Sequence, residues 1–237
     1  MATVLLVRHG RTSTNAGGTL AGHQPIGLDD VGRGQVAALA ARLAAAQLPL
    51  AAVVSSPLPR CRQTVSLALP DVDEVALEED LIECRYGDWT GQSLKKLAKD
   101  PMWMVVQAHP SAARFPGVEG ESMAQMSARS VAAVRRWDAR ITAGHGPDAV
   151  WLACSHGDVI KAIVADALGM HLDLFQRIVI DPASVTVIRF TPLRPFLLRL
   201  NDTGGDLAAF VPAKRRRSRS RKRSSDADVG GGTGAST

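Results

Sequence analysis

The sequence is poor in aromatic residues and has no long apolar run. Phe, Trp and Tyr together make up only 4% of its 237 residues, whereas 46% of all residues are hydrophobic. Ala, Val and Leu dominate the hydrophobic content, which favours helices packed on a sheet over an all-β sandwich. No apolar run approaches the ~20 residues of a membrane span, and the N-terminus lacks the pattern of a signal peptide. We therefore expect a globular, cytoplasmic protein without a membrane contact.

Cysteine is scarce as well, with only Cys61, Cys84 and Cys154 in the whole chain. Their number is odd and their spacing is not C-x-x-C, so they indicate neither a disulfide framework nor a zinc site. No arginine stands six positions after any of them, which excludes the phosphate loop of a cysteine phosphatase. We expect the three thiols to be reduced and structural.

The net charge of +5 comes from one end of the chain. Residues 213–237 contain eight Lys or Arg and two Asp, so residues 1–212 are close to neutral. The eight cations fall within residues 214–223, which have no apolar periodicity, and this predicts a disordered basic tail. We expect a folded domain over 1–212 and a tail over 213–237. The tail would bind polyanions weakly and in a salt-dependent way, or would simply be solvated without a dedicated partner.

Short apolar runs alternate with helical patterns along residues 1–212, which predicts an α/β fold. The strands are expected at residues 4–7, 51–56, 72–77, 149–154, 184–190 and 195–201. The helices are expected at residues 35–48, 57–69, 94–99, 122–143 and 159–169. We predict a three-layer α/β/α sandwich with a mostly parallel central sheet, and a helical lid insertion over residues 81–120. An exposed strand edge in the C-terminal part would allow a homo-oligomer.

Charged and titratable side chains follow three of the predicted strands. Arg8 and His9 come directly after the first strand, Arg60 follows the second, and His156 follows the strand at 149–154. Ligands of open α/β sheets bind beyond the carboxyl ends of the strands, so these side chains should converge on one crevice. Guanidinium groups suit a phosphate dianion, and a neutral imidazole can attack phosphorus as a nucleophile.

Four segments in this order resemble the histidine phosphatase superfamily, the phosphoglycerate mutase-like enzymes. They are VRHGRTSTN at 7–15, SSPLPRCRQT at 55–64, LIECRYGDWTG at 81–91 and CSHGD at 154–158. The resemblance extends over about residues 3 to 200, nearly the whole domain. It implies a phosphomonoesterase that acts on a small phosphorylated metabolite through a phosphohistidine, with neither a metal nor another cofactor.

The resemblance also implies roles for individual residues. His9 would be the nucleophile. The phosphoryl group would be bound by Arg8, Asn15, Gly22, His23, Arg60, His156 and the backbone N–H of Gly157. Two of these assignments have structural alternatives, because Asn15 would also suit a turn cap and a lone histidine such as His23 is often only a satisfied surface residue.

Glu83, in LIECRYGDW, matches the acid/base carboxylate of the family. It would protonate the leaving alkoxide and later deprotonate water, which requires a pKa raised by burial beside Tyr86 and Trp89. The acid-phosphatase branch instead carries an aspartate directly after the second histidine, where this chain has Gly157. Asp158 stands one position later and is the second candidate for the proton donor.

The segment 91–121 favours hydrolysis over mutase action. Family mutases carry two adjacent arginines here, whereas this chain has only Arg114 and an apolar run at 102–106, which is either a buried helix or part of the pocket. FPGVEGES resembles a family phosphatase motif but has two extra residues, which leaves the position of Glu121 open. The alternatives are mutase-like phosphoryl transfer, and an idle domain that serves the basic tail as a polyanion-binding adaptor.

Overall fold

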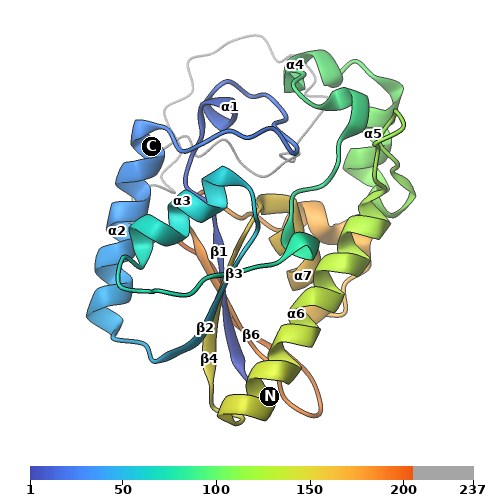
Figure 1. Cartoon of the computed structure of the whole chain (residues 1–237). Helices are drawn as coiled ribbons and strands as arrows, with labels where there is room; N and C mark the ends of the chain where they lie inside the picture. Colours follow the sequence, from blue (N-terminus) through green and yellow to red (C-terminus); the bar gives the residue numbers. More distant parts are fainter. Residues whose placement is uncertain (205–237) are drawn as a thin grey trace, which may run out of the picture.

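A computed structural model describes residues 1–204 of the chain. They form a six-stranded sheet with helices on both faces, which confirms the predicted three-layer α/β/α sandwich (Figure 1). None of the helices within these residues is both long enough and apolar enough to span a membrane. The end of the predicted domain, residues 205–212, and the predicted tail, with its expected disorder and polyanion binding, lie outside the described residues.

The sheet is mostly parallel, and one strand runs antiparallel to both of its neighbours. Its strands are β1 Thr3–Arg8, β2 Leu50–Ser55, β3 Ala76–Leu77, β4 Val150–Ser155, β5 Val185–Arg189 and β6 Phe196–Asp202. Their order is β3-β2-β4-β1-β5-β6, in which β5 runs antiparallel to β1 and to β6, and β5 and β6 form the expected C-terminal pair. The strands β1 and β2 are parallel, as expected of a βαβ unit, but β4 lies between them.

The third predicted strand is much shorter than expected. Residues 72–77 were predicted to be extended, yet only Ala76–Leu77 pairs with β2. The N–H of Val72 instead donates to the carbonyl of Leu69, so the start of this segment forms a turn. Asp71 lies within the turn and Asp73 follows it, and aspartate is depleted in strands and favoured in turns.

Helices cover both faces of the sheet. The α-helices are α1 Ser13–Ala16, α2 Asp30–Ala46, α3 Pro59–Ala68, α4 Leu94–Leu97, α5 Pro101–Ala108, α6 Met123–His145 and α7 Gly157–Ala167. Within residues 1–204, four short 3-10 helices complete them: η1 Glu79–Leu81, η2 Gly87–Trp89, η3 Pro110–Ala112 and η4 Leu172–Arg177. Helix α2 begins earlier than predicted, because the carboxylate of Asp29 caps it by accepting the N–H of Gly32 at 2.7 Å.

The strand β1 is buried on both faces, and its side chains alternate between two apolar clusters. Val4 and Leu6 belong to the cluster under α6 and α7, whereas Leu5 and Val7 belong to the cluster under α2 and α3. This alternation follows from the two-residue period of a strand, and burial on both faces explains why the run is apolar throughout. The end of β1 is therefore fixed in the centre of the molecule.

The segment between β3 and α6 forms the predicted helical insertion. Residues 101–108 form α5, which begins at Pro101 after the capping carboxylate of Asp100. Trp103 and Val106 are buried in the core, whereas Met104 is 57% exposed. Of the two interpretations of the apolar run at 102–106, the structure supports a buried helix.

Candidate active site

His9, Arg60 and Glu83 line one cleft at the carboxyl ends of β1 and β2. The opposite wall of the cleft comes from the segment around α1 and from Leu94 of α4. Both of these helices lie beyond the same end of the sheet, at the top of Figure 1. The cleft therefore occupies the place where open α/β sheets bind their ligands.

His9 follows β1, and its imidazole is held in one tautomer. Its backbone N–H donates to the carbonyl of Ser155, and its Nδ1 lies 2.7 Å from the carbonyl oxygen of Gly10. A carbonyl oxygen only accepts hydrogen bonds, so Nδ1 carries the proton and Nε2 keeps its lone pair. Burial, followed by the charges of Arg60 and Arg8, holds the pKa of His9 well below its usual value. At neutral pH His9 is therefore an uncharged imidazole whose Nε2 keeps its lone pair.

The glycine after His9 is required by close packing against α2. A Cβ atom on Gly10 would lie 2.8 Å from the carbonyl oxygen of Gly32 and 2.8 Å from Cγ2 of Val36. The N–H of Gly10 donates to Oγ1 of Thr64 on α3 at 3.0 Å. These contacts fix the backbone carbonyl that orients the imidazole of His9.

Arg60, near the start of α3, is the cation of the cleft. Its Nε donates to Nδ1 of His156 at 3.3 Å, and Nη1 and Nη2 donate to the carbonyls of Gln24 and Gly22. A guanidinium has five N–H donors, so two remain after these three bonds. The arginine is rigidly held and still has donors for an anion.

His156 is the residue directly before α7 and lies against His9, with 5.2 Å between the two ring centroids. Because its Nδ1 accepts from Arg60, its Nε2 carries the proton and donates to Oγ of Ser56 at 2.8 Å. Burial, and then the charge of Arg60, holds the pKa of His156 well below its usual value. Gly157 is the first residue of α7, where backbone N–H groups lack partners within the helix.

Arg8 is fully buried but does not line the cleft. Its Nη1 donates to the carbonyl of Ile180 at 2.7 Å. Burial lowers the pKa of Arg8 from its usual value, against the opposing effect of nearby carboxylates led by Glu83. Its charge therefore acts on His9 and Glu83 although its side chain does not line the cleft.

Asn15, Gly22 and His23 were all predicted to contact phosphate. The structure places the first two in the wall of the cleft and the third outside it. Asn15 lines the cleft, although its Oδ1 accepts from the N–H and hydroxyl of Thr12 in a capping box. Gly22 also lines the cleft. His23 does not; its Nε2 donates to the backbone carbonyl of Glu83 at 2.7 Å.

Glu83 lines the cleft, and the pKa of its carboxyl group is raised. One oxygen accepts the N–H of Cys84 at 2.9 Å, and the other lies 4.0 Å from Nδ1 of His156. Burial, and then the negative charge of Asp158, raises the pKa of Glu83 to about 7, against the opposing effect of Arg60. A carboxyl group with this pKa exchanges protons readily at neutral pH.

Asp158, the second candidate for the proton donor, is buried behind the cleft and does not line it. The hydroxyl of Tyr86 donates to its Oδ2 at 3.1 Å, and Nζ of Lys161 lies 3.6 Å from its Oδ1. The geometry therefore favours Glu83 as the proton donor. The sequence analysis attributed the raised pKa of Glu83 to burial beside Tyr86 and Trp89. It did not anticipate the contribution of the negative charge of Asp158.

Glu121 lies outside the cleft, in an ion pair with Arg129 of α6. The two side chains are joined by hydrogen bonds of 2.6 and 2.9 Å. No pattern in the sequence pointed to Arg129, because an arginine on a long helix usually faces water. Ser56 was also missed, although it follows β2 directly and its position at a strand end was a usable signal.

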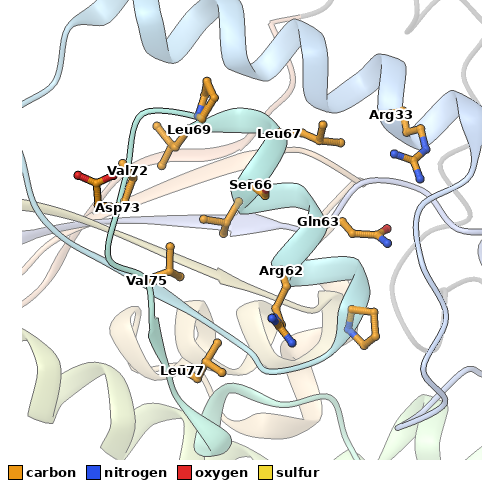
Figure 2. Close-up of a pocket in the computed structure, with 13 residues that line it drawn as sticks. Arg33, Arg62, Gln63, Ser66, Leu67, Leu69, Val72, Asp73, Val75 and Leu77 are labelled. Carbon is orange, nitrogen blue, oxygen red and sulfur yellow. The ribbon is translucent and has the colours of Figure 1, made fainter.

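A larger groove of about 750 Å³ lies on the outer side of α3, away from these residues. Figure 2 shows Arg62 and Gln63 facing it, together with apolar side chains such as Leu67 and Val75. None of the predicted catalytic residues lines this groove. Among residues 1–204, no three His, Cys, Asp or Glu side chains are grouped so that they would hold a metal ion.

Comparisons with known proteins agree on one family. The family model of the histidine phosphatase superfamily (branch 1) matches residues 4–203. A bifunctional protein of Mycobacterium tuberculosis is 34% identical over 204 residues, or 85% of this chain. The match is 54% of that relative, so the chain spans about half its length.

Two further relatives carry phosphatase names. A metal-independent phosphoserine phosphatase of Arabidopsis thaliana is 34% identical over 167 residues, which are 68% of this chain and 66% of the relative. The structure of a mycobacterial glucosyl-3-phosphoglycerate phosphatase with VO3 has a TM-score of 0.72 and 27% identity, and covers 84% of this chain and 98% of that one.

Proposed function

The chain belongs to the histidine phosphatase superfamily (branch 1), and on this premise we propose that it is a metal-independent phosphomonoesterase acting on a small phosphorylated metabolite. One observation carries the proposal: a neutral His9 with its Nε2 lone pair available shares a cleft with Glu83, whose pKa is raised to about 7. A nucleophile and a proton donor that are both ready at neutral pH suit phosphoryl transfer.

In the first step, Nε2 of His9 attacks phosphorus while the bond from phosphorus to the leaving oxygen breaks. Protonated Glu83 gives its proton to that oxygen, so the alcohol leaves neutral and Glu83 becomes a carboxylate. Arg60 and Asn15, which line the cleft, bind the oxygens of the phosphoryl group, and His156, which accepts from Nε of Arg60, orients that guanidinium. The N–H of Gly157 is a further donor at the positive end of α7.

In the second step, water attacks the phosphohistidine. Carboxylate Glu83 takes a proton from the water, the bond between phosphorus and Nε2 breaks, and inorganic phosphate leaves. His9 and protonated Glu83 are thereby restored. Buried Arg8 would stabilise the negative charge that both steps place near His9.

Hydrolysis is favoured over mutase action by the charge of the cleft. Arg60 is the sole lysine or arginine among the described residues that line it, so the described walls offer a phosphoglycerate carboxylate no second cation. Two polar but uncharged residues, Thr14 and Thr19, line the opposite wall instead. The apolar residues at 102–106, which first suggested hydrolysis, do not line the cleft.

Hydrolysis of p-nitrophenyl phosphate in excess EDTA tests this proposal. We expect turnover to be unchanged by the chelator, because charge in the site is supplied by Arg60 and Arg8. The same protein assayed with added Mg²⁺ or Zn²⁺ is the control. Activity that disappears in EDTA and returns with a metal ion would contradict metal independence, and a wild-type protein without turnover would contradict the proposed activity itself.

Replacing Asp158 with asparagine should change the pH profile in a defined direction. The negative charge of Asp158 raises the pKa of Glu83, so Asp158→Asn should lower that pKa. Glu83 must be protonated to give its proton to the leaving oxygen, and kcat/KM for an alkyl phosphate should therefore fall at a lower pH than in the wild type. The profile with p-nitrophenyl phosphate, whose leaving group needs no proton, serves as the control. Superimposable alkyl phosphate profiles would show that Asp158 does not act on Glu83.

A further inference from the structure

Glu83 stands on a segment that has little regular structure of its own. It follows the single 3-10 turn η1 and precedes η2, so no helix or strand fixes its backbone. A general acid has to be held within hydrogen-bond reach of the leaving oxygen, and a displacement of about 1 Å can cost roughly 100-fold in rate. Something outside the segment must therefore hold it.

Arg129 on α6 provides this support. Its Nη1 donates to the carbonyls of Asp80 and Ile82, both at 2.8 Å, and its Nη2 donates to the carbonyl of Glu83 at 3.1 Å. The remaining N–H groups, on Nε and Nη2, donate to the two carboxylate oxygens of Glu121. All five donors of the guanidinium are thereby used, and three of them bind the backbone that carries Glu83.

Glu121 holds Arg129 in this orientation. Burial alone would raise the pKa of Glu121, but the hydrogen bonds and charge of Arg129 outweigh it and hold that pKa below its usual value. The backbone N–H of Glu121 donates to the carbonyl of Arg85, and its Oε2 accepts the N–H of Arg85 at 3.2 Å. The ion pair therefore hydrogen-bonds to the backbone on both sides of Glu83, at Ile82 before it and at Arg85 after it.

His23 adds a second donor to the carbonyl of Glu83, at 2.7 Å. Neither Arg129 nor His23 lines the cleft. A group that binds the backbone of the acid without touching the substrate acts on the position of that acid alone. This distinguishes both residues from Arg60, which lines the cleft.

We propose that Arg129, locked by Glu121, is a positioning residue that aims the carboxyl of Glu83 at the leaving-group oxygen, and that His23 assists it. The inference rests on the proposed function and adds to it a part of the proton-transfer machinery. A lysine would not replace this arginine, because its single ammonium cannot reach three carbonyls and both oxygens of a carboxylate together.

The test is the dependence of kcat/KM on the leaving group. p-Nitrophenolate leaves without a proton, whereas the alkoxide of an alkyl phosphate needs the proton of Glu83. Arg129→Met should therefore lower kcat/KM about 100-fold for an alkyl phosphate and less than about 3-fold for p-nitrophenyl phosphate. Arg129→Lys should show the same selective loss, because it restores the charge without the geometry. Glu121→Gln, which keeps most of the contacts, should show it to a smaller degree.

Arg136→Met is the matched control. Arg136 lies on the same helix and pairs with the carboxylates of Glu78 and Asp80 near the same loop, but it bonds to no carbonyl there. Its loss should leave the ratio of the two kcat/KM values unchanged. His23→Ala separates two roles, because a phosphate contact would slow both substrates equally, whereas a positioning contact would slow the alkyl phosphate selectively.

Equal losses on both substrates in Arg129→Met, Arg129→Lys and Glu121→Gln would overturn the inference, because they would mean general damage to the fold. Full activity of Arg129→Lys on the alkyl phosphate would also overturn it, since charge alone would then suffice. A wild type without turnover on either substrate is a different outcome: it would remove the proposed function, and this inference with it.

Discussion

Replacing His9 with alanine is expected to reduce phosphate ester hydrolysis by about 10⁴-fold or more, because the step that breaks the ester bond loses its nucleophile. The loss should be of similar size for p-nitrophenyl phosphate and for alkyl phosphates, since both react through the same nitrogen. Initial rates of the wild type and His9→Ala, measured on both substrates, check the expectation.

The matched control is His145→Ala, at the exposed end of α6, which should have wild-type rates. Folding of His9→Ala is checked by thermal unfolding beside the wild type. The replaced imidazole is uncharged, so its removal should leave the ion pairs of the protein intact. A His9→Ala protein that keeps more than about 1% of the wild-type rate would show that phosphoryl transfer does not go through this residue.

Replacing Glu83 with glutamine should have a large effect that depends on the substrate. For an alkyl phosphate, kcat/KM should fall by about 10² to 10⁴-fold, the usual contribution of a general acid. For p-nitrophenyl phosphate, the first step should survive, while the second step lacks its base. The variant should therefore release one equivalent of p-nitrophenol in a rapid burst and then turn over slowly, which stopped-flow absorbance measures directly.

The control for this variant is Glu79→Gln, an exposed carboxylate of η1 close to Glu83 in the chain. It should show wild-type kinetics on both substrates. The pH dependence near 7 should also disappear in Glu83→Gln, because the group with that pKa is gone. Unchanged steady-state rates on the alkyl phosphate would assign the proton transfer to another residue.

The meeting of His9 and His156 could be predicted from the sequence for a simple physical reason. Each follows a short apolar run that forms a parallel strand, and parallel strands present their carboxyl ends at one edge of the sheet. The sequence did not predict that β4 lies next to β1 and separates it from β2. Strand order depends on long-range pairing, which leaves no mark on the local pattern.

Glu83 shows a different limit of sequence reasoning. It follows no strand, so only the family resemblance of its segment identified it as the acid. Its raised pKa comes from burial and from Asp158, a residue distant in the sequence. The sequence suggested that the nearby aromatic residues raise this pKa, because a sequence shows only which residues are adjacent in the chain.

Arg129 was beyond prediction from the sequence. It stands 46 positions from Glu83, on a helix with several other arginines. Only the fold distinguishes the arginine that binds carbonyls from its neighbours that pair with surface carboxylates. The sequence placed His23 near the site and predicted that it contacts phosphate. In the structure its imidazole donates to the backbone carbonyl of Glu83.

The central claim is that the phosphoryl group passes through His9, and mapping the trapped phosphoenzyme tests it most directly. Glu83→Gln would be mixed with p-nitrophenyl phosphate, quenched in base, which preserves phosphohistidine, and analysed by peptide mass spectrometry at high pH. We predict one phosphoryl group per chain, located on His9, and none in the double variant that also carries His9→Ala. A phosphoryl group on another residue, or rapid turnover without any phosphoenzyme, would contradict the account.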